Sequence, residues 1–158
     1  MPSTLLASIL RLNTRLFLNC VQDVTDAHGL QRPNGATNSL AFIACHLLDA
    51  RHYMARYLGL DERNPVEAVL RGVDGIDEVE LPPLVVIVDG WRTLAPTLEA
   101  CVAGLTESEL RAPSTQRFPI DQPTVLGGLG FLLQHDSYHI GQLALLRKYL
   151  GYPAMKYS

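Results

Sequence analysis

Apolar residues recur every three or four positions through four segments of the chain, which is the spacing of one face of an α-helix. No segment shows the sustained alternation of apolar and polar residues that is typical of a half-buried strand. The pattern predicts four long helices and therefore an all-α fold. The predicted helices cover residues 5–24, 38–59, 84–105 and 123–150.

Residues that favour the beginning or the end of a helix stand at several of these boundaries. Asn38 and Ser39 are both good N-caps for the second helix, and Gly59 is a suitable residue to end it. Gly151 is expected to end the last helix. Pro96 lies within the third helix and predicts a kink or a broken turn there, because proline cannot donate the backbone hydrogen bond.

The connection between the second and third helices, residues 60–83, is the least regular part of the chain. A short helix fits within "NPVEAVLRG" (64–72), and the acidic "DGIDEVELPP" (74–83) is expected to be exposed. A connection of this length can cross the molecule instead of making a tight hairpin. We therefore predict a single domain over residues 1–158, a four-helix bundle with a long crossover connection between its second and third helices.

Composition and charge exclude several classes of protein. The chain has 158 residues, of which 47% are hydrophobic and 18% charged, a globular profile with enough chain for one substantial core. The net charge is −3 and no cluster of Lys and Arg occurs, so we expect neither nucleic-acid nor membrane-surface binding. No apolar run is long enough to span a membrane, and no signal-peptide pattern is present. We expect a cytoplasmic protein.

Three cysteines, Cys20, Cys45 and Cys101, are widely separated and odd in number. They form no CxxC pair, so the sequence predicts no disulfide framework, in keeping with a reducing compartment. Their simplest interpretation is as small buried apolar residues.

Two histidines, His135 and His139, stand four residues apart on the predicted inward face of the last helix, where a bundle helix normally carries leucine. Side chains at this spacing are neighbours, so both rings can reach one ion. Burying two imidazoles without partners would cost about 1–3 kcal/mol for each unsatisfied group, and one shared cation would satisfy both. The pair therefore predicts a helical metal site of the HxxxH type.

A third ligand is available in His46, near the middle of the second helix. If the second and last helices are packed neighbours, the three rings converge. Three neutral histidines leave an open coordination position for water or substrate, as at catalytic zinc sites. Such a metal can lower the pKa of bound water or of a coordinated thiol. The alternative is that His46 is a hydrogen-bonded core histidine, as all three could be in a purely structural bundle.

Three polar residues near the histidines, Asp49, Asp136 and Gln142, could orient the ligands through hydrogen bonds. Each of them could equally be a solvated or hydrogen-bonded polar residue without a role at the metal. No catalytic residue is identified by the sequence.

Other candidates have simpler interpretations. Cys45 precedes His46 and points about 100° away around the helix, which makes it a poor ligand. His52 faces a different side of the helix and is expected at the surface or in a dimer contact, and His28 could favour the negative end of a helix dipole. The "GGLG" at 127–130 lacks the ending of a phosphate loop and is expected to allow close helix approach.

The segments "CHLLDARHYMARYLG" (45–59) and "FLLQHDSYHIGQLALLRKYLG" (131–151) resemble the DinB/YfiT-like family of metalloenzymes. The resemblance implies a four-helix bundle with a divalent metal, zinc or nickel first, held by His46, His135 and His139. It also implies a thiol S-transferase or hydrolase-like enzyme that acts on a small molecule with a low-molecular-weight thiol, such as bacillithiol or mycothiol, and a homodimer. The alternative is a non-catalytic metal-binding stress-response or sensor protein.

Overall fold

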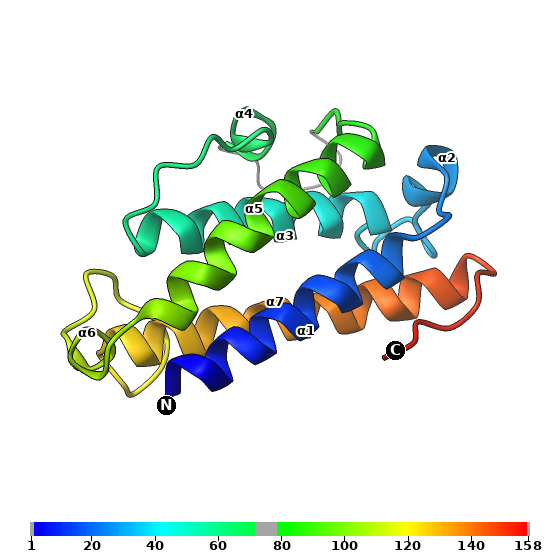
Figure 1. Cartoon of the computed structure of the whole chain (residues 1–158). Coiled ribbons are helices and arrows are strands. Elements are labelled where there is room, and N and C mark those ends of the chain that lie inside the picture. Colours follow the sequence, from blue (N-terminus) through cyan, green and yellow to red (C-terminus); the bar gives the residue numbers. More distant parts are fainter. Residues whose placement is uncertain (1, 72–78, 158) are drawn as a thin grey trace.

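The computed structural model describes residues 2–71 and 79–157, and over these ranges it contains seven helices and no strand (Figure 1). The prediction of an all-α fold is confirmed. Four helices are long: α1 (Pro2–Val21), α3 (Leu40–Tyr57), α5 (Leu84–Gly104) and α7 (Val125–Tyr149). Three are short: α2 (Asp26–Gly29), α4 (Glu67–Leu70) and α6 (Glu107–Arg111).

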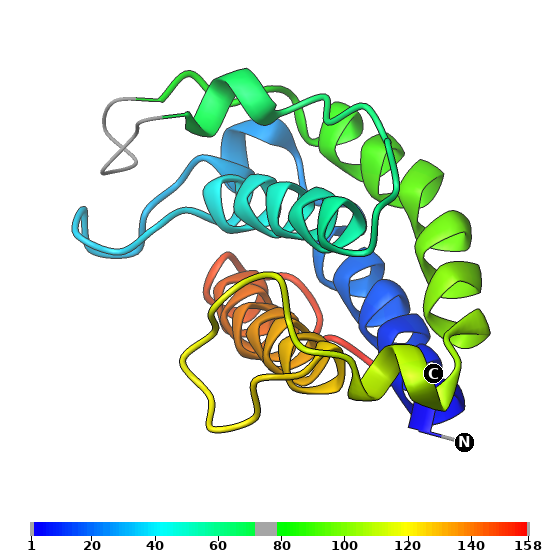
Figure 2. The same ribbon diagram turned by 90° about the vertical axis from the view of Figure 1, so that its left-hand side faces the viewer.

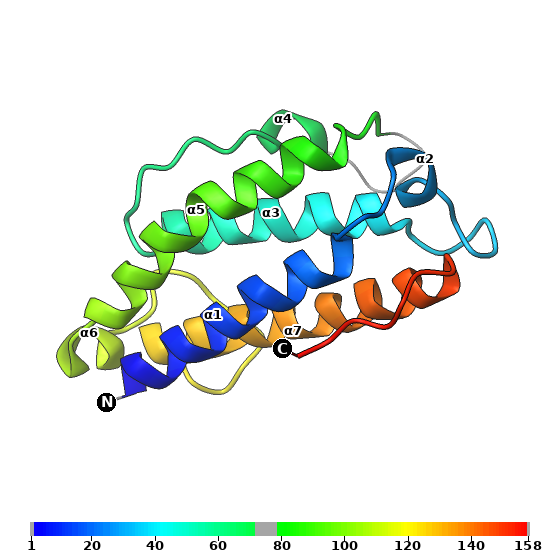
Figure 3. The ribbon, with the colours of Figure 1, turned by 45° about the vertical axis from the view of Figure 1, so that its right-hand side comes forward.

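The four long helices pack as a bundle in which α1 lies against α5 and α7, and α3 lies against the same two helices. Helices α1 and α7 run in one direction and α3 and α5 in the opposite direction (Figures 1 and 3). Because α3 and α5 are parallel, the chain has to return along the bundle between them, and the segment with α4 does so. The predicted crossover is confirmed. Of the acidic stretch 74–83, residues 74–78 lie outside the described residues.

Capping residues account for the ends of the two helices that carry histidines. The side chains of Ser39 and Thr124 are the N-caps of α3 and α7, and each accepts a backbone N–H of the first turn. Gly59 and Gly151, just beyond the C-terminal ends, have φ angles of 81° and 84°. Such angles are strained for a residue with a Cβ atom, so glycine ends both helices. The second and last helices begin and end within two residues of their predicted bounds.

The first and third helices differ from their predicted form. Helix α1 ends at Val21, earlier than expected, because Asp23 takes a left-handed φ of 62° and α2 follows as a separate turn. Helix α5 runs through Pro96 without interruption, so of the two predicted forms, a kink or a broken turn, the broken turn does not occur.

Helix α6 was not predicted, although its sequence carries a local signal. Thr106 is its N-cap and accepts the backbone N–H of Glu109, whose carboxylate in turn accepts the backbone N–H of Thr106. This reciprocal pair is a capping box. It is readable in the sequence as Thr-x-x-Glu, within a stretch otherwise interpreted as a linker.

The core lies between the four long helices, and it includes the stacked rings of Phe17 and Trp91, 4.0 Å between centroids. Cys20 and Cys45 are buried there as free thiols, as predicted, whereas Cys101 is only half-buried. Burial raises the pKa of Cys20 to about 11 and that of Cys45 to about 12. No helix in the described ranges is both long enough and apolar enough to cross a membrane.

Candidate metal centre

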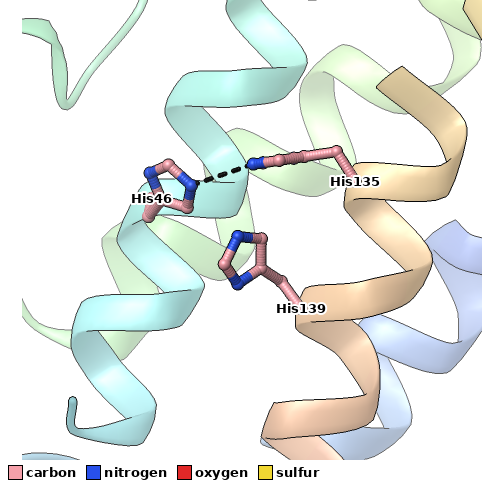
Figure 4. Close-up of side chains that lie close together, drawn as sticks. All are labelled: His46, His135 and His139. Atoms are coloured by element: carbon pink, nitrogen blue, oxygen red, sulfur yellow. Dashed lines mark hydrogen bonds between the residues drawn. The ribbon is translucent and has the colours of Figure 1, made fainter. Parts of the chain in front are cut away.

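Three imidazoles from α3 and α7 meet at one side of the bundle. His46 projects from α3, and His135 and His139 project from α7 toward it (Figure 4). The Nε2 atoms of His46 and His135 are 3.1 Å apart, and one nitrogen of each ring lies within 4.8 Å of the other two. In the described part of the chain, no other group of three or more His, Cys, Asp or Glu residues converges in this way.

The period of the helices places these rings at the edge of the core. His46 is half-buried while its neighbours Cys45 and Leu47 are fully buried, and on α7 the two histidines are half-buried beside the buried Asp136 and Ile140. The expectation that the α7 rings face the core is thus too strong. The buried face of α7 lies slightly around the helix, so the rings line the border between core and solvent.

The donor set fits a divalent metal ion. Metal–nitrogen bonds of 2.0–2.1 Å with tetrahedral angles place ligand nitrogens about 3.3 Å apart. The 3.1 Å between His46 and His135 is close to that value. A pair at the full 4.8 Å would have to close by about 1.5 Å, which small side-chain rotations achieve. Imidazole donors are well suited to zinc, nickel and copper.

The surroundings favour the neutral form of His46 and His135, which is the form that binds a metal. Burial, together with the neighbouring His139 and His46, lowers the pKa of His135 to about 4. Burial also lowers the pKa of His46, with His139 adding to the effect and the Asp49 carboxylate opposing it. Both shifts favour imidazoles that can bind a metal near neutral pH.

One of the three rings is oriented by a neighbouring side chain. The Nδ1 atom of His139 is 2.7 Å from Oε1 of Gln142, and the amide nitrogen of Gln142 donates to the Tyr138 hydroxyl. Because the amide oxygen accepts, Nδ1 of His139 carries the proton and Nε2 keeps its lone pair. The Nδ1 atom of His135, in contrast, is buried and makes no hydrogen bond with the described residues.

The two acidic candidates have other partners. Asp49 accepts a hydrogen bond of 2.6 Å from the Asn64 side chain, although it lies close enough to influence His46. Asp136 accepts a hydrogen bond of 2.5 Å from Arg51, and this pair is 1% and 2% exposed. Asp136 thus links α7 to α3 inside the core. Burial raises the pKa of the Asp136 carboxyl, and the adjacent guanidinium opposes that rise.

The two remaining histidines stand apart from the cluster. The prediction that His52 lies at the surface or in a dimer contact is wrong, because its side chain is only 3% exposed. The crossover segment that includes Glu62 and Pro65 covers this face of α3, and a separate cavity of about 420 Å³ lies there. His28 belongs to α2, and its Nδ1 atom is 2.7 Å from the Tyr152 hydroxyl.

A cavity of about 340 Å³ opens beside the rings and is lined by His46 and His135. Two charged residues, Asp49 and Arg117, also line it. The rest of its wall is aromatic or apolar: Ala50, Tyr53, Phe118, Pro119, Phe131 and Leu132. One side is formed by the loop between α6 and α7, which Figure 2 shows crossing α7 on the side that faces α3. Sequence reasoning missed these loop residues, since nothing local distinguishes them from a linker.

Two of the three glycines of "GGLG", Gly127 and Gly128, are explained by this loop. A Cβ atom on Gly128 would lie 2.6 Å from the Phe118 ring and 2.5 Å from the Tyr57 hydroxyl, and one on Gly127 would collide with the backbone of Gln122. The glycines therefore admit the loop and a tyrosine of α3. The expected close approach of helix backbones is replaced by these contacts.

Comparison with known proteins identifies one family. A family model described as the DinB superfamily matches residues 9–143, which include all three histidines. No match was found among curated proteins or among solved structures.

Proposed function

This chain belongs to the DinB superfamily, and we propose that it binds a divalent metal ion through His46, His135 and His139. The observation that carries the proposal is the convergence of one nitrogen from each ring within 4.8 Å. The rings come from two helices, and His46 and His135 are 89 positions apart in the sequence. Zinc or nickel is the proposed ion, because both bind imidazole well.

We further propose that the protein is a metal-dependent thiol S-transferase or a hydrolase-like enzyme that acts on a small molecule. Three histidines leave a coordination position open, and the 340 Å³ cavity leads to the rings. A bound divalent ion would lower the pKa of a thiol or of water there toward neutrality. Gln142 would hold His139 in its binding tautomer, and the aromatic wall would exclude water. A low-molecular-weight thiol is the proposed co-substrate.

Elemental analysis of untagged protein, purified without a metal column, tests the metal site. We expect about one equivalent of metal per chain and its loss in His139→Ala, which removes one of three ligands. His28→Ala is the matched control, because His28 bonds Tyr152 away from the cluster and should leave the metal content unchanged. A wild-type protein without metal, even after zinc is added, would contradict the proposal.

A second candidate function is a non-catalytic metal-binding stress-response or sensor protein, in which the ion ties α3 to α7. The position of His46 and His135 on different helices favours it. An ion that binds only the native state at a thousandfold excess over its Kd adds about 4 kcal/mol of stability. Both candidate functions are compatible with this gain in stability. Only a measurement of catalytic turnover separates the enzyme from the sensor. A screen of small thiols against electrophiles that yields metal-dependent product would favour the enzyme, and its failure the sensor.

We also propose that the protein is cytoplasmic and forms a homodimer. Its free cysteines support the cytoplasmic location, because disulfides are rare there. The homodimer is supported by exposed apolar side chains on one face of α7, namely Tyr138, Leu145 and Tyr149. Light scattering of the purified protein would give the mass of the assembly, and the mass of a single chain would contradict the proposed dimer.

A further inference from the structure

One basic side chain, Arg117, lines the same cavity as His46 and His135. It is exposed, and its guanidinium makes no hydrogen bond or ion pair with any residue of the described ranges. Arg51 and Arg111, in contrast, are each paired with a carboxylate. Arg117 is therefore a charged group beside the proposed metal site with its hydrogen-bonding capacity still available.

The backbone that carries Arg117 is held in place by its neighbour Phe118. This ring packs edge-on against Tyr57 at 5.3 Å and lies 5.4 Å from Phe131, between α3 and α7. The hydroxyl of Ser114, earlier in the loop, is 2.9 Å from the Tyr57 hydroxyl. At the base of the loop, Val125 donates a backbone hydrogen bond to Ala112, and Pro113 and Thr124 form an isolated bridge. The loop thus places Arg117 at the rim of the cavity.

The charges in the cavity favour an anionic ligand. Asp49 is its only acidic lining residue among the described side chains, and its carboxylate already accepts a hydrogen bond from Asn64. Arg117 offsets the charge of Asp49. A divalent ion on three neutral imidazoles would leave the cavity with a net positive charge, and its apolar wall would strengthen attraction to an anion.

We infer that Arg117 is a specificity-determining residue that binds a carboxylate group of the thiol co-substrate. This inference rests on the proposed function, because it places the reactive end of the ligand at the three rings. The apolar part of the ligand would lie against Tyr53, Phe118 and Phe131. A carboxylate is favoured over a phosphate because one guanidinium fork matches a carboxylate, and the described lining residues include no second basic side chain.

Binding of small thiols to the cobalt-loaded protein tests the inference. The near-ultraviolet charge-transfer absorption of a cobalt–thiolate contact gives the Kd of each thiol. We compare 3-mercaptopropionate, which carries a carboxylate, with the neutral 2-mercaptoethanol. We expect Arg117→Gln to raise the Kd of 3-mercaptopropionate about tenfold and to change the Kd of 2-mercaptoethanol less than about twofold. The tenfold value takes into account that Arg117 is exposed to solvent, which weakens the interaction.

Two variants separate recognition from general electrostatics. Arg15→Gln removes the same charge from an exposed position on α1, so the preference for the carboxylate should remain. Arg117→Lys keeps the charge without the planar fork and should retain part of the preference. If Arg117→Gln keeps the wild-type ratio of the two Kd values, the inference is overturned and the cobalt signal still supports the proposed function. If the wild type takes up no cobalt, the proposed function fails, and the inference fails with it.

Discussion

Two polar clusters join the same pair of helices, and they differ in how far the chain satisfies them. The Arg51–Asp136 pair lies in the core, 2% and 1% exposed, with the guanidinium also 4.1 Å above the Trp91 ring. The ring cluster of His46, His135 and His139 is half-buried and borders a cavity. His135 and Asp136 are adjacent in sequence, yet the His135 side chain belongs to the ring cluster and the Asp136 side chain to the ion pair.

This difference separates a structural contact from a candidate binding site. Buried polar groups in folded proteins are almost always hydrogen-bonded, and the ion pair obeys that rule within the chain. The ring cluster does not, because Nδ1 of His135 is buried and has no partner among the described residues. A polar cluster that the protein leaves incomplete is the one suited to an external ion.

The sharpest way to test the comparison is to break the ion pair. In Asp136→Ala the Arg51 charge stays buried without its partner, so we expect about 3–5 kcal/mol less stability. Urea unfolding monitored by circular dichroism measures the loss. The double variant Arg51→Met/Asp136→Leu removes both charges and should recover most of it. A single variant within about 1 kcal/mol of wild type would show that the pair is not a structural contact.

A smaller effect is expected when the orienting residue of the ring cluster is removed. Gln142→Ala deletes the acceptor of the His139 Nδ1–H, so we expect metal affinity to fall about 10–100-fold with little change in metal-free stability. Calorimetric titration with zinc measures the affinity. Gln134→Ala, at an exposed position on the same helix, is the matched control. Equal affinities in the two variants would show that Gln142 does not orient the ligand.

The smallest effect is the pH dependence of the metal-free protein. The folded pKa of His135, about 4, lies below its unfolded value of about 6.5, so the unfolded chain binds more protons between these values. The contribution of neutral His135 to the free energy of unfolding is therefore fully present above pH 6.5 and is lost as the pH falls toward 4. Because the ring is half-buried, the effect is reduced by solvent. Between pH 6.5 and 4 we expect the free energy of unfolding of wild type to fall by about 1 kcal/mol more than that of His135→Asn. Urea unfolding at several pH values measures both free energies. If the two proteins show the same change in the free energy of unfolding across this range, the expectation is contradicted.

Local signals predicted the elements that local physics controls. The apolar period identified four long helices, and the caps Ser39 and Thr124 set the starts of α3 and α7. The turn at Asp23 escaped prediction because a left-handed φ is uncommon for any residue other than glycine, even though aspartate and asparagine adopt it more often than most. The burial of His52 escaped as well, since it depends on a crossover segment that folds back over α3.

By itself, the sequence determined that His135 and His139 share one face of a helix, because residues four apart are neighbours at 3.6 residues per turn. Only the tertiary structure decided that His46 faces them, that Asp136 pairs with Arg51, and that Arg117 borders their cavity. The physical reason is that helix periodicity relates residues within a few turns. Contacts across the bundle depend on which helices are neighbours, and that choice results from burying the apolar faces of all four long helices together.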